Sequence, residues 1–131
     1  MIIYLVRHAE SVANVEKISA GHLDTHLTPE GVIQSQKLAS RFKIIDDFEI
    51  IYTSDLMRAY HTAREIHKHH PEKELITNSN LREKHFGDLE GESFEISRKK
   101  YLGPAIFWDV ESGETFDEHK KRVEQAVQEI L

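Results

Sequence analysis

The sequence predicts an α/β fold, a three-layer sandwich in which a mostly parallel sheet is flanked by helices. Two observations lead to this prediction. Short apolar runs at residues 2–6, 49–53 and 74–77 have the length and the β-branched content of strands. Between and after these runs, residues 28–42, 54–66 and 115–131 repeat apolar side chains at helical spacing. Strands that alternate with helices favour a parallel sheet covered by helices.

Each predicted helix begins with a capping signal. Thr28 is a good N-cap, and Pro29 suits the first helical position because its ring presets the backbone angle φ. Ser54 is a good N-cap for the second helix. Thr115 and Glu118 have the spacing of a capping box, so the third helix is expected to begin just after Thr115.

Length and composition indicate one globular domain, which we expect to span residues 1–131. The net charge of −6 argues against nucleic-acid binding, which needs a basic surface. The chain has no Cys, which excludes disulfides and thiolate chemistry. No apolar run approaches the ~20 residues of a membrane span. We therefore expect a cytoplasmic protein with no membrane and no nucleic acid among its partners.

The ends of two predicted strands carry residues that suit an anionic ligand. Arg7 and His8 follow the first strand, and Ser54 to Arg58 follow the second. Ligands of parallel sheets bind beyond the carboxyl ends of the strands, so the sequence predicts a site at this edge.

Five stretches of the chain together resemble the histidine phosphatase superfamily, which includes cofactor-dependent phosphoglycerate mutases and many small phosphatases. A single tripeptide match would be weak evidence, but these stretches follow the family's order and cover most of the chain. They are "LVRHAES" with Asn14 after it, "AGHLDTHLTPEG", "IYTSDLMRAYHTA", "LREKHFGDLEG" and "SGETFDEHKKRV".

The resemblance implies that His8 is a nucleophile that forms a covalent phosphohistidine. Its attacking nitrogen must be unprotonated, so the other ring nitrogen should donate to a fixed acceptor. Arg7 and Arg58 are implied as the clamp, because guanidinium groups bind phosphoryl oxygens bidentately. Without the family pattern, the pair Arg7-His8 also fits a solvated strand end, and Arg58 fits an exposed helix position off the apolar stripe.

Three further residues take roles from the resemblance. Glu83 matches the family's acid, which protonates the leaving oxygen and then activates water, and we expect burial or the nearby phosphate to raise its pKa. Asn14 and Gly21 match positions near the phosphoryl group, through an amide side chain and a close backbone approach. On their own, Glu83 also fits a solvated charged run and Asn14 an ordinary turn. The scheme requires no metal and no cofactor.

Two other clusters have structural interpretations. His67 and His70 have a spacing that metal ligands can use, but their place before Pro71 suits a helix end, so no metal site is predicted there. Tyr101, Phe107 and Trp108 could line a substrate pocket, and packing in the core or a lid is favoured.

Members of the family carry a second catalytic His on a late strand, after a helix that residues 115–131 resemble. This sequence contains no matching motif, so we expect a C-terminally incomplete domain that lacks its last strand or strands. The predicted function is hydrolysis of a small phosphomonoester through His8. Phosphoglycerate-mutase-type transfer and a non-catalytic phosphate-binding remnant are the alternatives. The substrate's identity and the choice between a monomer and a homo-oligomer stay open.

Overall fold

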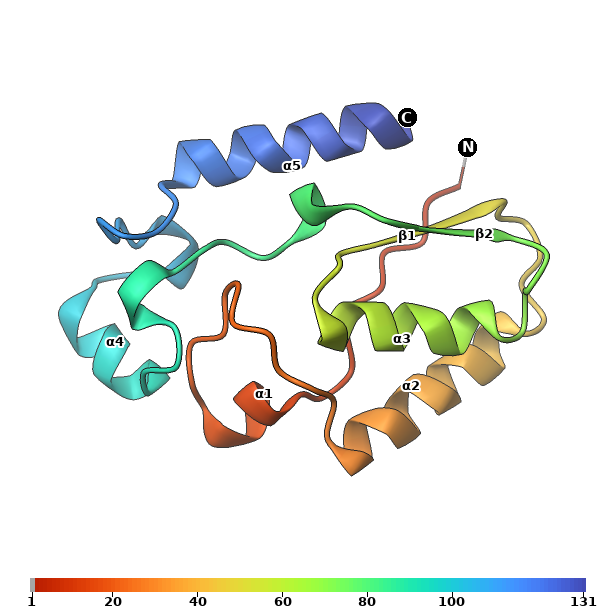
Figure 1. The fold of residues 1–131 in the computed structure, drawn as a ribbon, viewed down its shortest axis with the longest axis horizontal. Helices are drawn as coiled ribbons and strands as arrows, with labels where there is room; N and C mark the ends of the chain where they lie inside the picture. Colours follow the sequence, from red (N-terminus) through yellow and green to blue (C-terminus); the bar gives the residue numbers. More distant parts are fainter. Residues whose placement is uncertain (1) are drawn as a thin grey trace. The chain divides into compact units, whose positions relative to one another are not determined.

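The structure is a computed structural model that describes residues 2–131, shown in Figure 1. The chain divides into two compact units. The first unit contains residues up to 12 together with residues 25–79, and the second contains residues 13–24 and 80–131. The prediction of a single domain over residues 1–131 stays a prediction.

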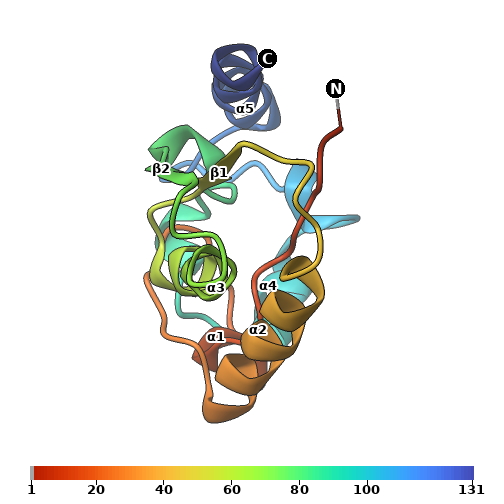
Figure 2. The same cartoon turned by 90° about the vertical axis from the view of Figure 1, so that its right-hand side faces the viewer.

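The first unit confirms the predicted α/β fold with a parallel sheet. Strand β1 (Ile50–Thr53) pairs in parallel with β2 (Glu74–Thr77), with Ile51 opposite Leu75 and Tyr52 opposite Ile76. Helix α3 (Met57–His67) connects the two strands, and both views show α2 (Pro29–Phe42) running beside it (Figures 1 and 2). A parallel pair needs such a crossover, because its strands run in the same direction.

The core of the first unit lies between α2 and α3. Ala39 and Phe42 of α2 pack with Ile66 of α3, and Phe48 and Ile51 lie against them. Ala39 and Phe42 belong to the apolar stripe that the sequence predicts, whereas Val32 of the same stripe is 40% exposed. Burial of a side chain the size of Phe or Ile contributes about 1.5–3 kcal/mol.

Residues 2–6 do not form the buried strand that their composition predicts. They are extended and exposed, and Leu5 keeps 93% of its surface. A strand is stabilised by a hydrogen-bonded neighbour and by covered faces, and among the described residues the sheet consists of β1 and β2 alone. Tyr4 is anchored all the same, because its ring packs 5.6 Å from that of Phe42 and its hydroxyl donates to Asp47.

The capping predictions are confirmed at α2 and α5 (Phe116–Ile130). Thr28 Oγ1 accepts a hydrogen bond from Gly31 N at 3.0 Å, and Pro29 is the first residue of α2. Thr115 and Glu118 form the predicted capping box. The prediction of Ser54 as the N-cap of α3 is wrong. Leu56 is the N-cap and α3 begins at Met57, while Ser54 Oγ accepts a hydrogen bond from Leu56 N at 3.2 Å before the helix.

The second unit has a hydrophobic core of its own, formed by Phe86, Leu89, Trp108 and Val110. Its helices are α4 (Phe94–Lys100), α5 and most of α1 (Val12–Glu16). Trp108 is 2% exposed and packs with Phe86 and Leu89, and its indole N–H donates to Gly103 O at 3.1 Å. This confirms core packing for Trp108. No helix in the described part of the chain has the length and apolar character that crossing a membrane requires.

Candidate active site

The segment that carries Arg7 and His8 is fixed by the two helices of the first unit. Ala9 N donates to Thr62 Oγ1 on α3 at 3.0 Å. On the other side, Thr28 N donates to Glu10 O at 3.0 Å, and Thr28 Oγ1 donates to the Glu10 carboxylate at 2.6 Å. The backbone around His8 is therefore held without a strand ladder.

Gly31 allows α2 to come this close. A Cβ at position 31 would lie 2.0 Å from Glu10 O, a distance that no carbon side chain can adopt. The glycine therefore lets the first turn of α2 press directly on the Glu10 backbone. Sequence analysis assigned no role to Gly31, although it lies in one of the family-like stretches.

His8 has the protonation state that a nucleophilic imidazole needs. Its Nδ1 lies 2.7 Å from Ala9 O, and since a carbonyl only accepts, Nδ1 carries the proton and Nε2 the lone pair. Burial lowers the pKa of His8, the bond to Ala9 O opposes this, and the charges of Arg58 and Arg7 lower the pKa further. The ring is therefore neutral at neutral pH.

Arg7, His8 and Arg58 all lie in the first unit. Both guanidinium groups act electrostatically on the His8 ring. Arg58 is 2% exposed, so it is not the solvated surface residue that its position off the apolar stripe allowed. It shares the buried face of α3 with Thr62, whose hydroxyl donates to Arg58 O at 2.8 Å. Arg7 is exposed.

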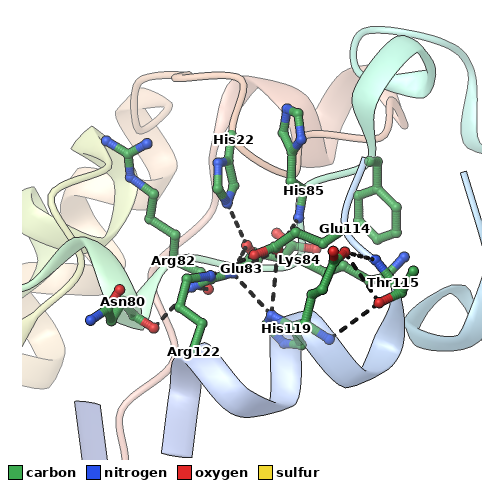
Figure 3. Close-up of polar contacts among 12 residues, drawn as sticks. His22, Asn80, Arg82, Glu83, Lys84, His85, Glu114, Thr115, His119 and Arg122 are labelled. Carbon is green, nitrogen blue, oxygen red and sulfur yellow. Dashed lines mark hydrogen bonds and ion pairs between the residues drawn. The ribbon is translucent and has the colours of Figure 1, made fainter. Parts of the chain in front are cut away.

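Glu83 lies in the second unit and its side chain is exposed, so of the two expected causes of a raised pKa, burial is absent and the charge of a bound phosphate stays a prediction. What the structure fixes is its backbone. Figure 3 shows the Glu83 carbonyl between two donors, His22 Nε2 at 2.9 Å and Arg122 Nη2 at 3.1 Å. Burial lowers the pKa of His22, and the bond to Glu83 O opposes that effect.

Position 21 requires a glycine for a steric reason that sequence analysis missed. Its φ is +51°, and a Cβ there would lie 2.3 Å from Glu90 Oε1 and 3.0 Å from Lys84 O. The same Glu90 oxygen accepts from His22 N at 2.8 Å and from Phe86 N at 3.0 Å. Gly21 thus lies close to the carbonyl of Lys84, the residue that follows Glu83.

Asn14 lies exposed on α1. Its assignment as a phosphate ligand rests on the family resemblance and stays a prediction.

Sequence analysis also missed the ion pair between Arg122 and Glu114. Arg122 Nε and Nη2 donate to the two Glu114 oxygens at 2.6 and 2.8 Å, and His85 N donates to Glu114 at 2.8 Å. Burial alone would raise the pKa of Glu114, but these hydrogen bonds and the charge of Arg122 lower it to about 2. Both residues stand in the last family-like stretch, which was the available signal.

One group among the described residues has the composition of a metal site. Asp46, His70 and Glu72 have ligand atoms within 4.8 Å of one another. Lys73 already pairs with Asp46 at 2.7 Å, and His70 Nε2 donates to Phe42 O at 2.8 Å. His67, whose spacing from His70 metal ligands can use, donates from Nε2 to Lys73 O at 3.0 Å.

Comparisons with known proteins identify the family. Residues 3–131 match the model of the histidine phosphatase superfamily (branch 1). Phosphoglycerate mutase-like protein 4 of Arabidopsis thaliana is 37% identical over 97 residues, which are 74% of this chain and 42% of that protein. A broad-specificity phosphatase of Saccharomyces cerevisiae is 34% identical over 92 residues, which are 68% of this chain and 40% of that protein.

A solved structure of similar fold supports the same family. Bacillus stearothermophilus YhfR superposes with a TM-score of 0.80 at 31% identity, over 95% of this chain and 64% of that one. The chain thus spans less than two thirds of the length of these three proteins.

Proposed function

Because this chain belongs to the histidine phosphatase superfamily, we propose that it hydrolyses small phosphate monoesters through a phosphohistidine on His8. The observation that carries the proposal is the state of His8. Its Nδ1 proton is held by Ala9 O, and two guanidinium groups lie within electrostatic reach of the ring. A neutral imidazole beside two cations suits attack on a dianionic phosphoryl group.

In the first step, the Nε2 lone pair of His8 forms the N–P bond while the ester P–O bond breaks. The leaving oxygen keeps the bonding electrons and takes a proton from the carboxyl group of Glu83. Arg7 and Arg58 offset the charge of the phosphoryl oxygens, and bidentate contacts would fix their orientation. The alcohol then departs.

In the second step, the Glu83 carboxylate takes a proton from water as the water oxygen attacks phosphorus. The N–P bond breaks, its electron pair returns to Nε2, and inorganic phosphate leaves. The exposure of Glu83 suits this step, since its carboxylate has to meet water. Any rise in its pKa then has to come from the bound phosphate rather than from burial.

A phosphatase is favoured over a mutase. The stretch from residue 91 to residue 113 is short. In the mutases of this family, the corresponding stretch is longer and contains an insertion that holds the sugar phosphate. In this chain, Trp108 from the same stretch is committed to the core of the second unit.

The test is release of nitrophenolate from p-nitrophenyl phosphate by the parent chain and by His8→Ala, with the exposed His69→Ala as a matched control. We expect turnover by the parent and the control and none by His8→Ala. Quenching in alkali, which preserves phosphohistidine, should trap the phosphoryl group on the parent. Equal turnover by parent and His8→Ala would refute the proposal.

Two further outcomes would overturn it in other directions. Isomerisation of 3-phosphoglycerate without hydrolysis would make the protein a mutase. Binding of inorganic phosphate without turnover of any ester would make it a binding module.

A further inference from the structure

We infer that Arg122 is a positioning residue that holds the Glu83 backbone in its reactive placement. The inference rests on the proposed role of Glu83 as acid and base. Arg122 lies on α5, 39 residues along the chain from Glu83. Its guanidinium group nevertheless reaches the peptide that carries the acid (Figure 3).

Every N–H of the Arg122 guanidinium group has an acceptor. The Nε group and one Nη2 hydrogen bond Glu114, and Nη1 donates to Asn80 O at 2.9 Å and to Arg82 O at 3.0 Å. The remaining N–H of Nη2 is shared between Glu83 O at 3.1 Å and His119 Nδ1 at 3.0 Å. A guanidinium group has five such donors in a rigid plane, so three carbonyls of residues 80–83 are fixed relative to α5.

The same peptide is also held from its other side. His22 Nε2 bonds Glu83 O at 2.9 Å, and the next residue, Lys84, is fully buried with its ammonium group 2.5 Å from Trp108 O. Glu83 is therefore an exposed side chain on a backbone that is immobilised at its own carbonyl and at the following residue.

This arrangement matters because the reach of the exposed Glu83 side chain toward a leaving oxygen depends on where its backbone is placed. A misplacement of about 1 Å can cost about 10²-fold in rate. Glu114 holds Arg122 in place, because its two oxygens fix the plane of the guanidinium group. A hydrogen bond from His85 N in turn fixes the Glu114 carboxylate.

Arg122→Lys is the most informative change. A lysine keeps the positive charge opposite Glu114 but cannot donate to three carbonyls and a carboxylate at once. Residues 80–83 would lose hydrogen bonds from α5 to the carbonyls of Asn80, Arg82 and Glu83. Lys121→Met serves as the matched control, because Lys121 is the neighbouring cation on α5 and is exposed.

The readout compares kcat/KM on two esters. Nitrophenolate departs without a proton, whereas the alkoxide of glycerol phosphate needs one, so only the second ester requires the acid in its first step. We expect Arg122→Lys to lower kcat/KM about 10²-fold on glycerol phosphate and far less on p-nitrophenyl phosphate. The loss should not add to that of Glu83→Gln in the double variant.

The outcomes separate the two claims. If Glu83→Gln lowers kcat/KM equally on both esters, Glu83 is not the acid and the proposed function fails at that residue. If Glu83→Gln is selective but Arg122→Lys is not, the positioning inference is overturned while the proposed function stands. An equal loss on both esters together with a lower urea midpoint for Arg122→Lys would show a merely structural role.

Discussion

Replacing Glu114 by Gln should remove a pH-dependent part of the protein's stability. In the folded protein the pKa of Glu114 is lowered from 4.5 to about 2, in spite of its burial, by bonds from Arg122 and His85 N. Its side chain is 18% exposed, so solvent screens these contacts only in part. A depression of this size corresponds to at most about 3 kcal/mol of stability.

The direction in which stability changes with pH follows from proton binding to Glu114. Between the two pKa values the unfolded chain binds a proton on Glu114 and the folded chain does not, so stability falls as the pH falls from 4.5 toward 2. Above the unfolded pKa the contribution is fully present. Glu114→Gln cannot ionise, so the gap in unfolding free energy between parent and variant should be largest near neutral pH and should close in acid.

The assay is urea denaturation followed by circular dichroism, repeated from about pH 7 down to about pH 3 for parent and variant. Glu111→Gln, an exposed neighbour in the sequence, is the control and should show little gap at any pH. A gap between the parent and Glu114→Gln that keeps the same size across this pH range would refute the reasoning, because it would not come from ionisation.

Three more predictions follow from the packing and electrostatics. Gly31→Ala should lower the free energy of unfolding by about 1–3 kcal/mol in urea, since its Cβ would meet Glu10 O at 2.0 Å. Trp108→Ala should lower it by about 3–5 kcal/mol, because the most buried aromatic of the second unit leaves a cavity. Arg7→Gln should raise the pKa of His8, measured by NMR titration of its ring protons, because a nearby positive charge is removed.

Each of these variants has a control variant. Glu30→Ala, for Gly31, and Phe107→Ala, for Trp108, should change the free energy of unfolding little. Arg41→Gln, for Arg7, should change the pKa of His8 little. All three control residues are exposed. Unchanged stability in Gly31→Ala or Trp108→Ala would contradict the contacts described for them. A pKa of His8 that falls or stays constant in Arg7→Gln would contradict the electrostatic coupling.

Local features of the fold were predictable from the sequence. The caps at Thr28 and Thr115 and the boundaries of β1 and β2 follow from residues only a few positions apart, because the atoms that bond are near neighbours in the chain. The candidate nucleophile and its two arginines were predictable for another reason: their stretches resemble a family whose chemistry needs them. The structure then placed His8 within reach of both charges.

Contacts between distant segments were not predictable. Residues 2–6 read as a buried strand, but a strand also needs a paired neighbour, and composition does not encode whether one is present. The close approach of Glu90 to Gly21, which the missing Cβ permits, was not predictable, and the assignment of Gly21 to the phosphate site stays a prediction. No local pattern shows that Arg122 bonds a carbonyl 39 residues away.

By itself, the sequence determined the three longest helices, the caps of two of them, the parallel strand pair and the residue types that phosphoryl chemistry requires. Only the tertiary structure decided which charges are buried, as Arg58 is, and which glycines are needed for close approach. The physical reason is the range of the interactions. Caps and periodicity act within a few residues, whereas burial, ladder pairing and a guanidinium group shared among carbonyls depend on segments that meet only after the chain has folded.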